Sequence, residues 1–88
     1  MLTLMKFYAD WCGPCSAMLP TMENLKEEFK DQVIFSDINI EDNPQVRLDY
    51  QIRSIPAFIL LKDRKEVARK IGSANLSDMQ EWIEEYRA

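Results

Sequence analysis

Two cysteines at the junction between an apolar run and a segment of helical periodicity constrain this chain's fold more than any other feature. Leu2–Tyr8 is a short apolar run with one lysine inside it, which predicts a buried strand. Cys12 and Cys15 follow, and apolar residues then recur at helical spacing, which predicts a helix over about residues 14–30 with a bend at Pro20. A buried strand that leads into a helix is the first half of a βαβ unit, so we expect an α/β protein.

The rest of the sequence predicts the remaining elements of one domain over residues 1–88. They are a strand over residues 33–40, a helix over residues 44–50 that starts with Asn43 as cap, a hairpin of strands over Ala57–Lys62 and residues 66–71 that ends at Gly72, and a final helix that starts near Asn75. The order β-α-β-α-β-β-α predicts a mixed four-stranded sheet flanked by three helices, with helices on both faces.

Composition and charge argue against several classes of function. The 88 residues have a net charge of −4 with no basic face to offset it, which argues against nucleic-acid binding. No apolar run approaches the roughly 18 residues of a membrane-spanning helix. The first residues lack the basic leader and cleavage site of a signal peptide, so we expect a cytoplasmic protein, and cytoplasmic thiols are normally kept reduced.

The spacing and position of the two cysteines favour redox chemistry. Unpaired amides and the positive end of the helix dipole converge on Cys12, which favours its thiolate, and Cys15 lies within reach one helical turn away. A metal site is a weaker alternative, because the chain has no histidine and no third cysteine. A purely structural disulfide is also weaker, because closing so short a loop removes little entropy from the unfolded chain.

Several motifs in the sequence resemble the thioredoxin family. They are FYADWCGPC after a strand, Pro20 five residues beyond Cys15, NIEDNP, SIPAFILL, and the Gly72 before the last helix. The resemblance spans nearly the whole chain in order, and WCGPC with a later Ile-Pro is a specific combination. The chain differs from the common form of the family in lacking an extra N-terminal strand and helix, which leaves a core of glutaredoxin size.

The resemblance implies a role for each residue of the CGPC motif. Cys12 is the expected exposed nucleophile, which attacks a disulfide of a target protein and forms a mixed disulfide. Cys15, expected to be more buried, then attacks Cys12 and releases the reduced target. Gly13 and Pro14 are expected to hold the turn and keep the redox potential in the reducing range.

The resemblance also implies a substrate-docking surface around the cysteines. Pro56 is the expected cis-proline facing the disulfide, and the backbone of Ile55 would pair with an extended substrate segment. Trp11, Pro14, Ile55 and Gly72 would complete the surface. Two simpler interpretations remain open: Trp11 is a half-buried packing residue, and Pro56 is an ordinary trans turn proline.

One position departs from the family pattern. Six residues before Cys12 the family usually has a buried aspartate, whereas this chain has Lys6, and on the neighbouring strand it has Asp37 where the family often has a lysine. We therefore predict that Lys6 and Asp37 form a partly buried ion pair beneath the cysteines and act in catalysis. A cation near Cys15 would favour its thiolate. A solvated lysine on a sheet edge is the simpler alternative.

The function that the resemblance implies is reduction of disulfides in target proteins, with the Cys12–Cys15 disulfide as the redox group and no further cofactor or metal. The expected electron donor is an enzyme of the thioredoxin-reductase type. One alternative is a glutaredoxin-like reductase that takes electrons from glutathione, and another is a binding module that does not use its thiols. The polar residues of the strand over residues 33–40, which is expected to form a sheet edge, predict a monomer.

Overall fold

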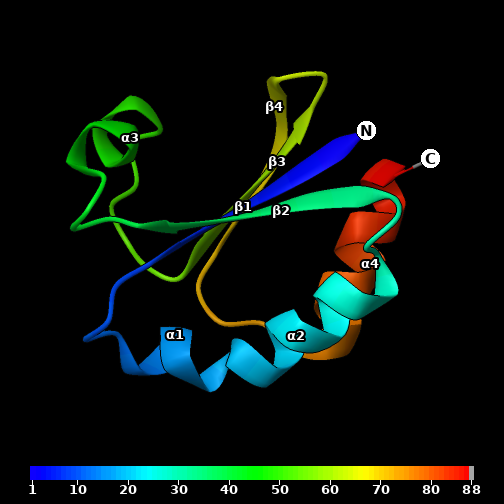
Figure 1. Cartoon of the computed structure of the whole chain (residues 1–88), viewed down its shortest axis with the longest axis horizontal. Helices are drawn as coiled ribbons and strands as arrows, with labels where there is room; N and C mark the ends of the chain where they lie inside the picture. Colours follow the sequence, from blue (N-terminus) through cyan, green and yellow to red (C-terminus); the bar gives the residue numbers. More distant parts are fainter. Residues whose placement is uncertain (88) are drawn as a thin grey trace.

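A computed structural model describes residues 1–87 of the chain. Its elements are β1 (Leu2–Tyr8), α1 (Gly13–Ala17), α2 (Leu19–Glu28), β2 (Val33–Asn39), α3 (Pro44–Asp49), β3 (Ala57–Lys62), β4 (Lys65–Ile71) and α4 (Leu76–Arg87) (Figure 1). The strands form one sheet in the order β2-β1-β3-β4, in which β1 pairs parallel with β2 and antiparallel with β3, and β3 pairs antiparallel with β4. The predicted mixed four-stranded sheet and the predicted edge position of β2 are confirmed.

The helix predicted over residues 14–30 is wrong in one respect, because it is two helices. α1 ends at Ala17 and α2 begins at Leu19, with Met18 between them at φ −87° and ψ −3°. Pro20 has no N–H to donate to the preceding turn, so a continuous helix would lose a hydrogen bond there. In the first turn of α2 that missing N–H has no consequence. The sheet is therefore flanked by four helices rather than three.

The sheet separates two hydrophobic cores. The core on the face covered by α2 and α4, called here the α4 face, contains the buried side chains of Leu2, Leu4, Met18, Met22, Leu25, Phe29, Val33, Phe58, Leu60, Met79 and Ile83. The core on the opposite face, called the α3 face, contains Met5, Phe7, Ala9, Cys12, Cys15, Ile38, Ile40, Ile52, Ala57 and Ile59, with Val46 and Tyr50 of the α3 region packed against it. Helices therefore cover both faces, as predicted (Figure 1).

Local sequence signals account for most element boundaries. Asp63 and Arg64 have φ of 53° and 70°, so they form the two-residue turn of the β3–β4 hairpin and let β4 start at Lys65. The N–H of Asp78 donates to Asn75 Oδ1 at 2.8 Å, which confirms Asn75 as the cap of α4. Asn43 holds the cap position of α3, but its side-chain amide donates to the Asn39 carbonyl instead of capping the helix.

Within residues 1–87, no helix is both long and apolar enough to cross a membrane.

Candidate active site

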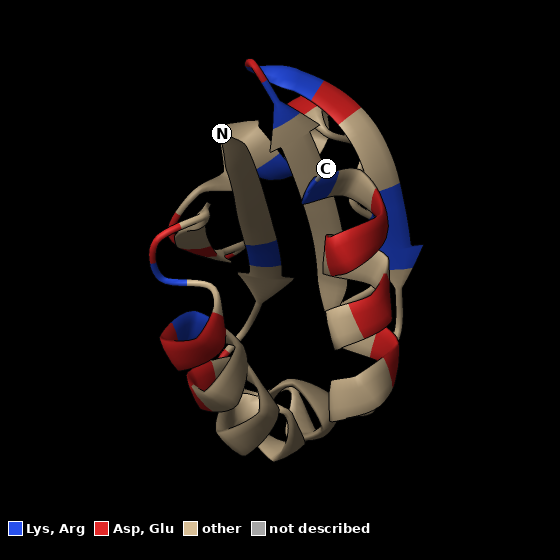
Figure 2. Ribbon diagram, turned by 90° about the vertical axis from the view of Figure 1, so that its right-hand side faces the viewer, with Lys and Arg blue, Asp and Glu red and all other residues tan. Residues whose placement is uncertain are grey.

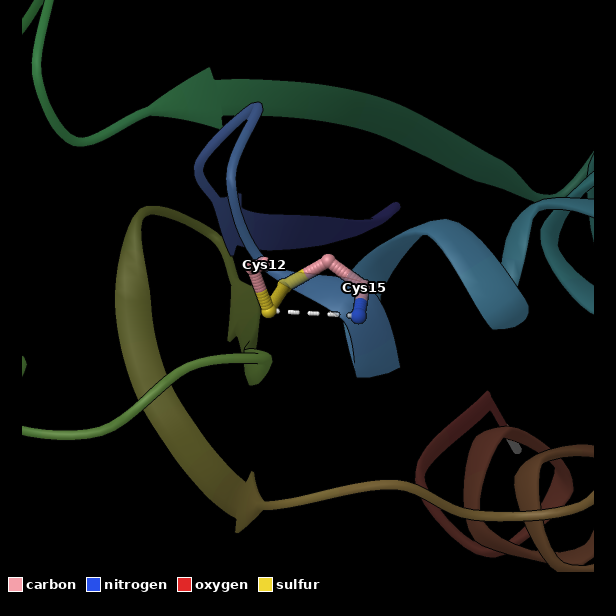
Figure 3. The surroundings of a disulfide bond; sticks show 2 residues. All are labelled: Cys12 and Cys15. Carbon is pink, nitrogen blue, oxygen red and sulfur yellow. Dashed lines mark hydrogen bonds between the residues drawn. A yellow bond between two sulfur atoms is a disulfide. The ribbon is translucent and has the colours of Figure 1, made fainter.

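Cys12 and Cys15 lie where the chain leaves β1 and enters α1. The Cys12 N–H donates to the Ala9 carbonyl at 3.1 Å, which closes the turn after the strand, and Cys12 is the N-cap of α1. Its Sγ accepts a hydrogen bond from the Cys15 N–H at 3.2 Å (Figure 3). The sulfur thus takes the place that a serine or aspartate oxygen takes at other helix starts, and an amide that favours negative charge on the acceptor points at it.

The two cysteines form a disulfide across the first turn of α1 (Figure 3). Their Cα atoms are 5.3 Å apart, within the range that a disulfide spans without backbone movement. The expectation that Cys12 is exposed is wrong for this disulfide form, because its exposed fraction is 4%. Cys15 is buried as expected, with an exposed fraction of 3%. Both side chains belong to the core of the α3 face, so both cysteines are buried in the disulfide form.

The segment before β3 packs against the core cluster that contains the cysteines, through Ile55. The Ile55–Pro56 peptide bond is cis, which rules out the trans alternative for Pro56. Pro56 is buried, and its carbonyl accepts a hydrogen bond from the Gly72 N–H at 2.8 Å, so Gly72 lies beside it. Ile55 precedes the paired residues of β3, which leaves its backbone outside the ladder of strands.

Trp11, Gly13 and Pro14 form an exposed rim around the disulfide. The Trp11 side chain has an exposed fraction of 67%, so the alternative that it is a half-buried packing residue is wrong. A Cβ atom at Gly13 would meet nothing within 4 Å, so packing within the domain does not require glycine there. An exposed aromatic residue and open backbone beside a reactive pair leave room for another chain to approach.

The predicted ion pair between Lys6 and Asp37 is wrong, although their strands place them as neighbours. The two residues are cross-strand partners in the register of β1 and β2. Asp37 lies at the exposed edge of the sheet, and its Oδ2 is 2.9 Å from Nζ of Lys26 on α2. Lys26 reaches Asp37 from the helix above the sheet, so a contact between elements overrides the pairing that the strand register suggested.

Lys6 makes no described ion pair, and its side chain is buried. It lies on the inner strand β1 with an exposed fraction of 3%, so the alternative of a solvated lysine on an edge is wrong as well. β1 contains one basic residue and no acidic one (Figure 2). Lys6 Nζ lies 5.1 Å from the centre of the Tyr8 ring, a cation–π distance.

A cavity of about 210 Å³ is lined by both Lys6 and Cys15. Its walls are formed by Lys6, Tyr8, Ala9, Asp10, Cys15, Ser16, Leu19 and Asp37. The sequence did not identify Tyr8, Asp10, Ser16 and Leu19 as part of a site. Leu19 is four residues beyond Cys15, so the continuous helix predicted over residues 14–30 would have placed it beside Cys15.

Within residues 1–87, no three side chains of histidine, cysteine, aspartate or glutamate are grouped to hold a metal ion. The reactive group that this site offers is the disulfide and the two thiols it yields on reduction.

The chain is similar to known thioredoxins in sequence and structure. A family model described as Thioredoxin matches residues 1–85. Thioredoxin from Rhodospirillum rubrum is 40% identical over 78 residues, which are 89% of this chain and 75% of the relative. Thioredoxin from Chlamydia caviae is 44% identical over 71 residues, which are 81% of this chain and 69% of the relative. The structure of a mutant thioredoxin from Halobacterium salinarum matches with a TM-score of 0.91 at 30% identity, covering 99% of this chain and 75% of that one.

Proposed function

Because the chain belongs to the thioredoxin family, and is thus a thiol–disulfide oxidoreductase that reduces disulfides, we propose that Cys12 is its nucleophile and Cys15 its resolving thiol. The observation that carries this assignment is the hydrogen bond from the Cys15 N–H to the Cys12 sulfur at the start of α1. An amide donor and the helix dipole both favour a thiolate at Cys12, and the thiolate is the attacking form.

The reaction proceeds by two exchange steps. The Cys12 thiolate attacks one sulfur of the target disulfide, so that a Cys12–target bond forms, the target S–S bond breaks, and one target thiolate leaves and takes a proton from water. The Cys15 thiolate then attacks Cys12 Sγ. The Cys12–Cys15 bond forms, the mixed disulfide breaks, and the second target thiolate leaves. The target gains two electrons and the protein is left in its disulfide form.

The target docks on the exposed rim and on the segment beside Pro56. Trp11, Gly13 and Pro14 supply open surface on the side of α1, and Ile55, Pro56 and Gly72 form the other side. The Ile55 backbone lies outside the sheet ladder and can pair with an extended target segment. Pairing through backbone atoms tolerates different target side chains, which suits an enzyme that reduces disulfides in several proteins.

We also propose an electron donor, a cellular compartment and an oligomeric state for this protein. The family reduces disulfide-containing proteins and is recharged by a reductase; here the donor is a thioredoxin-reductase-type enzyme, and the protein is a cytoplasmic monomer whose redox group is the Cys12–Cys15 disulfide alone. Two alternatives make different predictions. A glutaredoxin-like enzyme would reduce insulin with glutathione in place of a reductase, and a binding module would keep its biological role after both cysteines are replaced by serine.

Two serine variants test the assignment of the cysteines. Cys15→Ser is expected to stop after the first step and to accumulate a covalent complex with its target on Cys12. Cys12→Ser is expected to form no such complex and to lose insulin reduction altogether. The complexes are detected by non-reducing electrophoresis, with the double serine variant as the control. Equal trapping by the two single variants would contradict the assignment, and capture with Cys15→Ser identifies the targets and the donor.

A further inference from the structure

Lys6 is a buried cation that the two exchange steps leave without a role. Lysine is almost never fully buried unless a partner compensates its charge. Within residues 1–87, neither a hydrogen-bond acceptor nor a carboxylate contacts Lys6 Nζ, and the cation–π contact to Tyr8 is its one described polar interaction. The nearest strand partner that could have neutralised it, Asp37, is bound instead by Lys26.

The cavity explains how the ammonium group is tolerated. No enclosed side-chain nitrogen or oxygen of residues 1–87 lacks a hydrogen-bond partner, so Lys6 Nζ must keep access to solvent, and the cavity it lines provides that access. A volume of about 210 Å³ is several times the roughly 30 Å³ that one water occupies. Lys6 Nζ therefore lies at the wall of a cavity large enough to hold water rather than in the dry core.

Cys15 lines the same cavity. Lys6 and Cys15 come from β1 and α1, and the other titratable groups at the walls are Tyr8, Asp10 and Asp37. Asp10 is exposed, and the charge of Asp37 is offset by Lys26 from α2. Lys6 is the one cation among the residues that line this cavity, and no described carboxylate contact compensates its charge, so it is the group at these walls that can stabilise an anion at Cys15.

We propose that Lys6 is a positioning residue that stabilises the Cys15 thiolate across the shared cavity and so speeds the steps in which Cys15 attacks or leaves. This proposal rests on the proposed function of the cysteine pair. The charge acts through space and through water in the cavity, without a bond to the reacting sulfurs.

The stabilised thiolate enters the cycle twice. In the second exchange step, the Cys15 thiol must lose its proton to water before its sulfur attacks Cys12. In the recharging reaction, a donor thiolate attacks Cys12, a donor–Cys12 bond forms, the Cys12–Cys15 bond breaks, and Cys15 leaves as a thiolate. A positive charge near Cys15 favours the required anion in both directions, because an opposite charge stabilises the charged form of a thiol.

Stopped-flow reaction of the reduced protein with an aromatic nitrobenzoate disulfide separates the two cysteines. Attack by Cys12 releases the first coloured thiolate, and attack by Cys15 on the mixed disulfide releases the second. Lys6→Met, which keeps the length of the side chain and removes its charge, is expected to leave the first phase near the wild-type rate. The second phase at neutral pH is expected to slow about tenfold, the factor that corresponds to one pH unit in thiol ionisation.

The pH profile distinguishes an electrostatic role from a structural one. The Cys15 thiol of Lys6→Met is expected to ionise at higher pH than in the wild type, as followed by NMR of a labelled cysteine. Its second phase is therefore expected to approach the wild-type rate as the pH rises and Cys15 ionises in both proteins. Lys6→Arg retains the charge and is expected to restore most of the rate, and Asp37→Asn is expected to shift the ionisation of Cys15 in the opposite direction.

Lys70→Met is the matched control. Lys70 is also a lysine over an aromatic ring on the same face of the sheet, 5.6 Å from the Trp82 ring centre, but it does not line the cavity. It is expected to leave both phases unchanged. An unchanged second phase in Lys6→Met, or an equal loss in Lys70→Met, would overturn the role of Lys6. If the wild type itself releases no thiolate faster than free cysteine, the proposed function fails instead.

Discussion

Two neighbouring rows of side chains cross the α4 face of the same sheet and differ completely in character. One row runs from Phe35 through Leu4 and Leu60 to Ala68, and all four residues are apolar. The next row, about 7 Å along the strands, runs from Asp37 through Lys6 and Phe58 to Lys70 and contains three charged residues. Both rows use the same four strands, and Leu4 and Lys6 are both buried.

The difference follows from what covers each row: the Leu4 row belongs to the hydrophobic core, whereas Lys6 and Asp37 of the next row line the cavity. The Leu4 row lies under α2 and α4, in the apolar cluster that contains Met22, Leu25 and Met79. The Lys6 row lies toward the end of β1 that leads to the cysteines, and α1 and the start of α2 leave a cavity over it. In these two rows a buried charge therefore occurs only where the cavity begins, and Cys15 lines the same cavity.

The largest expected effect on the free energy of unfolding comes from placing a charged residue in the apolar Leu4 row. Leu4→Lys places the same charged residue one row away, where Leu4 is fully buried and no described cavity reaches it. We expect the free energy of unfolding to fall by about 4–5 kcal/mol, because an unpaired charge is buried and a packed leucine is lost. Urea denaturation measures the loss.

Leu4→Met is the volume-conserving control for that variant and is expected to change the free energy of unfolding by less than about 1.5 kcal/mol. Tolerance of lysine at position 4 would show that the cavity is not what makes Lys6 possible.

Replacing Lys6 by an uncharged residue is expected to change the free energy of unfolding by a smaller amount and in the opposite direction. Lys6→Met is expected to raise the free energy of unfolding of the oxidised protein by about 1 kcal/mol, because replacing a buried charge by an apolar group of similar size removes a desolvation penalty. The wild-type residue would then lower stability in favour of exchange chemistry. Thermal unfolding at neutral pH measures the change, and a marked destabilisation would instead assign Lys6 a structural role.

The smallest expected effect on the free energy of unfolding comes from Glu66 and Arg69, a pair on β4 that is exposed whereas Lys6 is buried. Hydrogen bonds from the Arg69 guanidinium, at 2.8 and 2.9 Å, lower the pKa of Glu66 below its ordinary value of 4.5. A lowered pKa in the folded state means that the pair's contribution is present above pH 4.5 and is lost as the pH falls through the folded-state pKa. Because the pair is exposed, we expect only a few tenths of a kcal/mol.

Chemical denaturation of the wild type and Glu66→Gln between pH 7 and acid conditions measures that contribution. The two proteins are expected to differ at neutral pH and to converge as Glu66 becomes protonated. A difference that stayed constant over the whole range would indicate that the substitution acts through packing rather than through the carboxylate charge.

The sequence predicted the sheet well and the helices and side-chain contacts less well. The bounds of β1 and β3 were predicted in full, because continuous apolar runs are characteristic of strands buried on both faces. The break at Met18 was missed, because Pro20 is compatible both with a bent helix and with the first turn of a new one. A partly buried ion pair of Lys6 and Asp37 was expected; Lys6 is buried, but Asp37 pairs with Lys26 instead.

By itself the sequence determined the order of the strands along the chain, the position of the cysteines at a helix start, and the Ile-Pro segment that follows. These features depend on backbone hydrogen bonds and on the alternation of apolar residues, which act over a few neighbouring positions. Only the tertiary structure decided that Lys26 binds Asp37 and that a cavity joins Lys6 to Cys15. Those contacts depend on the distance and angle at which α1 and α2 pack over the sheet, which no local pattern specifies.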